Sequence, residues 1–228
     1  MPKNMSRLEG FKGMIIDRNH YSLRDDLKAE LSESLSGFLE KYEILKGYSV
    51  EQRNNEYYTS REFLDLVKES VKLKQAKYIN LNSNSNCKST IPLGESTAGQ
   101  PFGAEIHDCI SSFVASNSDL PKKDCSNTGR MLYPKNGYMG WHNNSRVGWR
   151  IYCTYCVEDA KSYFRYEDDN GEFVDCLESK GWNFRFFYIR DTFSPFWHSI
   201  YTETERVAIG TYLGKDQNKI QNLLGEIK

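Results

Sequence analysis

The stretch YPKNGYMGWHNN, residues 133–144, decides how the rest of the chain is interpreted. It ends with His142 and Asn144, and residues at i and i+2 of a β-strand point to the same side of the sheet. We therefore expect both side chains to face the interior of a barrel. Far downstream, a second aromatic stretch carries His198, and the stretch after it begins with Arg206.

Taken together, these residue types indicate a metal site beside a carboxylate-binding pair. Non-haem Fe(II) oxygenases hold iron with two histidines and one carboxylate, and they leave other positions open for a co-substrate and O2. Arg206 offers a planar guanidinium suited to bidentate capture of a carboxylate, and Tyr133 could donate its phenolic hydroxyl to the same group. Because a lone histidine in an aromatic strand is more often a core residue, the interpretation depends on these residues occurring together.

The first half of the sequence has a helical pattern. A helix is expected over residues 23–46, another from Thr59 with a Thr-x-x-Glu cap completed by Glu62, and a third over 103–117. The first of these helices buries a row of leucines at i+4 spacing, namely Leu23, Leu27, Leu31, Leu35 and Leu39. Residues 80–100, rich in Asn, Ser and Gly, are expected to form a long loop, and such loops tend to be mobile or functional.

From Arg130 onward the pattern becomes strand-like, with short aromatic and β-branched runs. These runs cover residues 149–157, 162–166, 183–189, 196–201 and 206–213. Helices followed by many short strands predict an α+β fold, with an antiparallel sandwich or barrel buttressed by N-terminal helices. We expect one domain over 1–228, with helical support in 1–120, a β core in 130–213 and a last helix at 215–227.

Composition narrows the classes of partner. Thirty basic and 31 acidic residues give a net charge of -1, which argues against generic binding to nucleic acid or anionic membranes. No apolar run is long enough for a membrane span and the N-terminus has no signal-peptide pattern, so we expect a cytoplasmic protein with reduced cysteines. The pair Cys153 and Cys156 falls within an expected strand, with thiols on opposite faces, and is interpreted as core packing. Nothing in the sequence indicates the oligomeric state.

The chain resembles the 2-oxoglutarate- and Fe(II)-dependent dioxygenases, and most closely their prolyl 4-hydroxylase branch. The resemblance covers roughly residues 130–213 and lies in the 133–144 motif, in Arg150 opening RIYCTY, and in His198 and Arg206. It implies a double-stranded β-helix, the jelly-roll barrel of cupins, with Fe(II) and 2-oxoglutarate as cofactors and O2 as a reactant.

Within this resemblance, His142 and His198 are implied iron ligands, while Arg206 and Tyr133 are implied to bind the distal carboxylate of 2-oxoglutarate. No catalytic residue beyond the metal centre is implied. The reaction would be hydroxylation of a C–H bond in a prolyl or other peptide side chain or in a small molecule. Two aromatic residues near the strand ends, Tyr138 and Trp197, are candidates for lining the substrate opening, although core packing is the more common role for either one.

Asn144 departs from the family pattern, which has Asp at this position. An amide oxygen can bind iron but carries no negative charge, so we expect a weaker third ligand. The alternatives are a barrel that binds a ligand without turnover and a different metal arrangement. Family halogenases leave this position to a small residue so that halide can enter, and Asn is too large for that.

Overall fold

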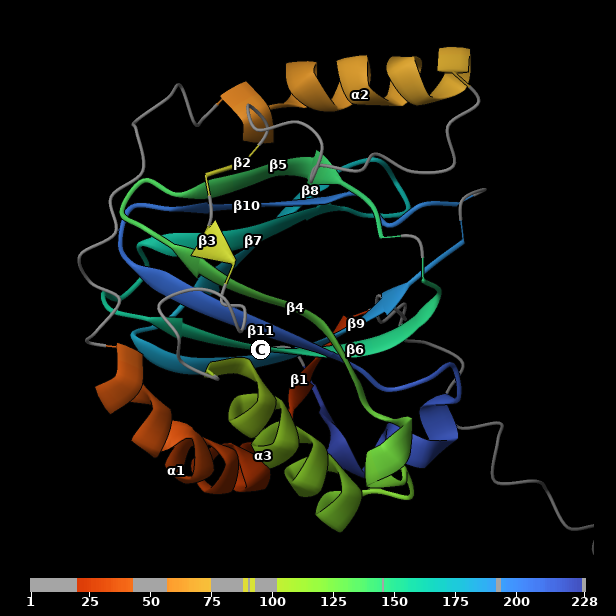
Figure 1. Ribbon diagram of the computed structural model, residues 1–228. Coiled ribbons are helices and arrows are strands. Elements are labelled where there is room, and N and C mark those ends of the chain that lie inside the picture. The colour runs from red at the N-terminus through yellow and green to blue at the C-terminus, as the bar shows by residue number, and fades with distance from the viewer. Residues whose placement is uncertain are drawn as a thin grey trace, which may run out of the picture.

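Two antiparallel β-sheets face each other in the computed structural model, which describes residues 20–42, 57–74, 88–89, 91–92, 102–144, 146–191 and 194–226 (Figure 1). The larger sheet has seven strands, in the order β12 (Leu224–Gly225), β1 (His20–Leu23), β9 (Gly181–Ile189), β6 (Gly148–Cys156), β11 (Arg206–Tyr212), β4 (Ser126–Tyr133) and β3 (Ile91–Pro92). The smaller has five, in the order β2 (Lys88–Ser89), β5 (Tyr138–His142), β10 (His198–Thr202), β7 (Ser162–Glu167) and β8 (Phe173–Glu178).

Helices cover the outer faces of both sheets. Helices α1 (Asp25–Tyr42) and α3 (Phe102–Asn117) lie behind the larger sheet, and α2 (Arg61–Lys74) lies on the far side of the smaller one, after the short 3-10 helix η3 (Tyr57–Thr59) (Figure 1). A second 3-10 helix, η6 (Lys122–Asp124), connects α3 to β4. The observed architecture is therefore a sheet-rich α+β fold, in agreement with the expected class, while the double-stranded β-helix stays a prediction.

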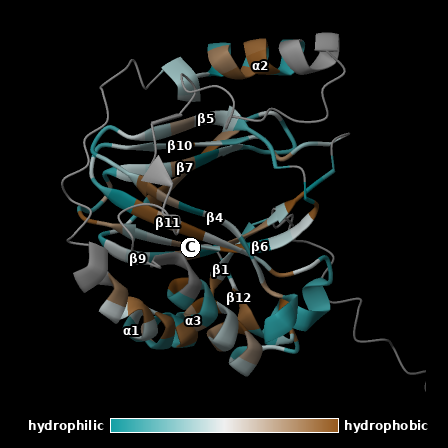
Figure 2. Ribbon diagram, viewed as in Figure 1, coloured by the Kyte–Doolittle hydropathy of each residue, from teal (hydrophilic) through white to brown (hydrophobic). Residues whose placement is uncertain are grey.

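The hydrophobic side chains form three layers. One cluster packs α1 and α3 against the larger sheet, and Leu31 of α1 and Ile110 of α3 are fully buried in it. A second cluster fills the space between the sheets with rings such as Phe164 and Phe187. The third lies between the smaller sheet and α2. Figure 2 shows hydrophobic residues, in brown, on β4 and β11 and on the helices below them.

Several element boundaries differ from those expected. Leu23 belongs to β1 and not to the first helix, because its backbone pairs with Leu224 of β12. The cap of α2 is Ser60, not Thr59, since the Ser60 hydroxyl accepts the Phe63 N–H at 3.2 Å. In place of the expected helix at 215–227, the chain forms a 3-10 helix, η7 (Gln217–Leu223), that runs directly into β12.

The other predicted elements are partly confirmed, and some lie outside the described residues. The helix expected over 103–117 and all five expected strands are present within one or two residues of their predicted bounds. Strand β8 was not predicted. Residues 43–46 of the first expected helix and most of the loop at 80–100 lie outside the described residues. Within the described parts of the chain, no helix is long and apolar enough to cross a membrane.

Candidate functional site

Two neighbouring strands bring His142 and His198 together. The last residue of β5 and the first of β10 are direct partners in the antiparallel register, and the pairing shifts between His198 and Ile200, as at a β-bulge. The two imidazole centroids are 4.1 Å apart. Residues far apart in the sequence thus form one buried histidine pair, with exposed fractions of 9% and 2%.

Both rings are held in the same way. Nδ1 of His142 lies 2.9 Å from the Gly140 carbonyl oxygen, and Nδ1 of His198 lies 2.9 Å from that of Phe196. A carbonyl oxygen only accepts, so each Nδ1 carries the proton and the lone pair resides on Nε2. Metal-binding histidines are fixed in this manner by a partner on the other ring nitrogen.

Asn144 lies beside the pair but not on a strand. Because β5 ends at His142, the expectation that Asn144 shares its strand is wrong. The side chain nevertheless reaches the pair, with its amide nitrogen 3.2 Å from Nε2 of His198, and it is close enough to the Tyr152 hydroxyl to lower the pKa of that group, although burial raises it. Half a turn of the amide would present its oxygen in place of its nitrogen.

The environment keeps His198 neutral. Burial, followed by the proximity of His142, lowers the pKa of His198 well below its ordinary value. Neutral imidazole is the form that binds metals. Arg150, from β6, is close enough to lower the pKa of His198 further.

Arg206 is already paired. Its Nε and Nη2 donate to the two carboxylate oxygens of Glu178 at 2.6 and 2.8 Å, and both side chains are about 2% exposed or less. Tyr133 is the register partner of Arg206 on β4, and the guanidinium carbon lies 4.9 Å from its ring centroid. The structure thus brings Tyr133 and Arg206 together as expected, but with an internal carboxylate between β8 and β11 that the sequence did not reveal.

The pKa shifts of Arg206 and Glu178 indicate that both side chains are charged in the folded protein. Burial alone would raise the pKa of Glu178, but the charge and hydrogen bonds of Arg206 and a hydrogen bond from Ser162 hold that pKa at about 2. The same carboxylate raises the pKa of Arg206, against the effect of burial. Burial also raises the pKa of Tyr133 to about 12, so its hydroxyl stays protonated.

Arg150 is a second buried guanidinium, and its sequence context marked it only as part of the family motif. It is 3% exposed, and Nη2 donates to the Arg146 carbonyl at 2.8 Å. Its Nε and Nη1 have no hydrogen-bond partner among the described residues. Burial lowers its pKa.

Tyr138 and Trp197 do not join the histidine pair. Tyr138 is fully buried and stacks on Tyr58 of η3, with 5.1 Å between ring centroids. Trp197 packs with Trp141 and Leu64 in the cluster under α2. The structure therefore places both rings in packing against the α2 side and gives no support to a substrate-lining role.

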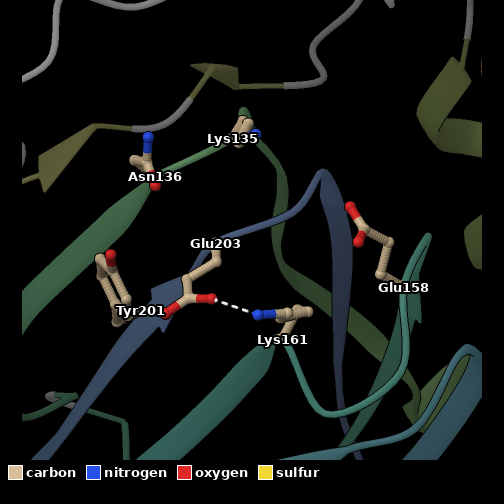
Figure 3. Close-up of a pocket in the computed structure, with 6 residues that line it drawn as sticks. All are labelled: Lys135, Asn136, Glu158, Lys161, Tyr201 and Glu203. Atoms are coloured by element: carbon tan, nitrogen blue, oxygen red, sulfur yellow. Dashed lines mark hydrogen bonds and ion pairs between the residues drawn. The ribbon is translucent and has the colours of Figure 1, made fainter.

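A surface hollow of about 260 Å³ lies at the other end of β10 from His198 (Figure 3). Lys161 and Glu203 form an ion pair of 2.9 Å across it. The remaining lining residues are Lys135, Asn136, Glu158 and Tyr201. Because Tyr201 and His198 are at opposite ends of the same strand, this hollow is distinct from the candidate site.

The donor set fits a divalent metal only in part. Among the described residues, no group of three His, Cys, Asp or Glu side chains could hold a metal ion. Two imidazoles and one amide remain, which suit Fe(II) in kind but lack the anionic ligand. The proposed anchor of 2-oxoglutarate does not fit that co-substrate as it stands, because Nε and Nη2 of Arg206 already donate to the Glu178 carboxylate.

Comparisons with known proteins give distant structural likenesses. No family model and no curated protein matches the chain. A prolyl hydroxylase in complex with a hypoxia inducible factor oxygen degradation domain peptide fragment from Trichoplax adhaerens is 13% identical, with a TM-score of 0.40, and the match covers 86% of this chain and 96% of that one. A prolyl-4-hydroxylase from Pseudomonas putida is 11% identical, with a TM-score of 0.33 and coverage of 82% and 98%.

The coconut allergen cocosin is 15% identical, with a TM-score of 0.30. The match covers 40% of this chain, which spans only 22% of the allergen's length. At these identities and TM-scores the likenesses establish no shared function, so the proposals below rest on the residues of this chain.

Proposed function

We propose that this protein is a metal-binding barrel of the Fe(II) oxygenase type, with His142, His198 and Asn144 as the metal ligands. The observation that supports it best is the histidine pair, whose rings are 4.1 Å apart and whose Nδ1 atoms are each fixed by a backbone carbonyl. Bound iron would supply the activation of O2.

The chain's own residues would position the metal and keep its surroundings dry. The two Nε2 atoms would bind it, and Asn144 would turn its amide oxygen toward it. The nearby Tyr152 hydroxyl, on a partly buried side chain, would hold the other side of that amide. The substrate would be a peptide side chain or a small molecule with an unreactive C–H bond, as the sequence resemblance implies. No step is assigned to 2-oxoglutarate, because Arg206 is paired with Glu178.

Metal titration tests this proposal. Mn(II), a redox-silent substitute for Fe(II), should bind the wild type, and His142→Ala and His198→Ala should each abolish binding because two donors cannot hold the ion. His107→Ala is the matched control, since His107 lies on α3 behind the larger sheet. Electron paramagnetic resonance of free Mn(II) provides the measurement. Unchanged affinity in both site variants would refute the assignment.

A second candidate is a barrel that binds a ligand without turnover. It is favoured by the neutral amide of Asn144 and by the carboxylate that already neutralises Arg206. Consumption of O2, with ascorbate as the electron donor, separates the two candidates. Iron-dependent O2 uptake that exceeds a no-iron control and is lost in His142→Ala supports the oxygenase, and metal binding without O2 uptake supports the binding protein.

A further inference from the structure

Glu178 has the surroundings of a bound carboxylate ligand, although it belongs to the chain. Besides the two bonds from Arg206, its oxygens accept the Ser162 hydroxyl at 2.7 Å, the Thr154 hydroxyl at 2.9 Å and the Cys156 thiol at 3.4 Å. These donors come from β6, β7 and β11, and Glu178 is the last residue of β8. Residues of three strands therefore form a binding site for one carboxylate, and Glu178 of a fourth strand fills it.

We propose that Glu178 occupies this carboxylate subsite from within, so that Arg206 is closed to an external carboxylate as long as Glu178 remains in place. The proposal uses the proposed function only to name the excluded ligand, the distal carboxylate of 2-oxoglutarate. Such a ligand would have to approach an arginine whose charge is already neutralised, and its own charge would be repelled by Glu178.

The hydrogen bonding of the Arg206 guanidinium supports the proposal that Glu178 takes the place of an external carboxylate. Nη1 of Arg206 has no hydrogen-bond partner among the described residues, so only the edge formed by Nε and Nη2 is in use. Two parallel N–H bonds along one edge are the bidentate arrangement in which a guanidinium binds a carboxylate. An incoming carboxylate would be left with the outer N–H groups of Nη1 and Nη2, without the Ser162 and Thr154 hydroxyls that already donate to Glu178, unless Glu178 left.

Removing the internal carboxylate should recreate the subsite. Glu178→Ala deletes a fragment that corresponds closely to acetate, and it leaves Arg206, Ser162 and Thr154 around the space. We expect acetate to raise the melting temperature of Glu178→Ala in a saturable manner, by several degrees more than chloride at equal ionic strength. The wild type should not distinguish the two salts. 2-Oxoglutarate should bind Glu178→Ala at least tenfold more tightly than the wild type.

Two controls isolate the subsite. Asp175→Ala removes a carboxylate that pairs bidentately with Arg165 at 2.5 and 2.7 Å on the outer face of the same strand pair, and it should show no acetate response. The double variant Glu178→Ala with Arg206→Met removes both buried charges and should also show none. If Glu178→Ala is unfolded in the absence of acetate, circular dichroism can follow its folded fraction as acetate is added. A saturable increase in the folded fraction then gives the same readout.

The outcomes separate this proposal from the metal site. An acetate response confined to Glu178→Ala supports an internal carboxylate even if no variant binds Mn(II), which would refute only the metal assignment. Absence of any acetate response in Glu178→Ala overturns the proposal. Equal affinity of the wild type and Glu178→Ala for 2-oxoglutarate also overturns it, because Glu178 would then exclude nothing.

Discussion

Asn144 puts a neutral amide where a metal site of this type would gain most from a negative charge. We expect Asn144→Asp to increase the affinity for Mn(II) by about tenfold or more. Charge attraction at a few ångströms and partial burial is worth about 1–4 kcal/mol before desolvation, and about 1.4 kcal/mol corresponds to a factor of ten. Titration of the variant beside the wild type measures the change. If Asn144→Asp leaves the affinity unaltered while His142→Ala abolishes it, Asn144 does not contact the metal.

Glu178 gives the protein a defined acid sensitivity. Its pKa is about 2 in the folded chain, against an ordinary 4.5, so the carboxylate stabilises the fold above pH 4.5. That stabilisation, about 3 kcal/mol by the linkage of pKa to free energy, is lost as the pH falls from about 4.5 to about 2. Glu178→Gln should remove this pH dependence from the free energy of unfolding. Urea unfolding at several pH values measures this free energy. If it falls equally with pH in the wild type and in Glu178→Gln between about pH 4.5 and about pH 2, the prediction is wrong.

Among single residues, the sequence reveals those that belong to a recognisable motif. It does not reveal a residue whose role depends only on partners from other strands. Tyr133, His142, His198 and Arg206 lie in order in a recognisable pattern, and the structure brings them together in pairs. Glu178 has no local mark, because its partners lie on three other strands. The position of Asn144 was also misjudged, since the end of β5 depends on pairing with β10 and not on local alternation.

Among the secondary-structure elements, α2 supports the histidine strands from behind. Trp141 and Trp197 directly precede the two histidines and point to the opposite side, where they pack against Leu64 of α2. The indole nitrogen of Trp141 also donates to the Ser60 carbonyl at 2.8 Å. The helix is tied to the sheet by Glu167 of β7, which accepts Lys68 at 2.6 Å and Arg61 at 3.1 Å.

Leu64→Ala should therefore weaken metal binding as well as the fold. Removing a fully buried leucine costs about 2–5 kcal/mol. The matched control is Leu31→Ala, an equally buried leucine of α1 in the cluster behind the larger sheet. Both variants should lose stability in urea unfolding, but only Leu64→Ala should also lose affinity for Mn(II). Equal losses of metal affinity in the two variants would show that α2 has no specific role in holding the histidines.

Most elements were located because their burial leaves a local pattern in the sequence. The leucines of α1 recur at helical spacing because one face of the helix meets the core, and β6 and β11, which are buried on nearly every residue, stand out as short runs of aromatic and β-branched residues. Strand β8 escaped prediction because its exposed Leu177 and buried Glu178 reverse the expected alternation of buried apolar and exposed polar residues. The end of the chain forms η7 and β12 because Leu224 pairs with Leu23, which no local pattern reveals.

For the molecule as a whole, the class and the layering followed from the order of helices and strands along the chain. The sequence did not reveal that helices cover both sheets, since the apolar face of α1 or α2 does not say which sheet that helix will cover. The partition of strands between the two sheets was equally hidden, because it depends on contacts between distant segments.

The position of β1 has a consequence for the chain while it is being synthesised. This strand lies between β9 and β12 and pairs with Phe187, Phe186 and Arg185 on one side and with Leu224 and Gly225 on the other. A ribosome makes the N-terminal strand first, so β1 emerges long before either neighbour. Pairings this distant in sequence form slowly. The larger sheet can therefore be completed only after Gly225 has left the ribosome, and until β9 has emerged β1 has neither of its native neighbours.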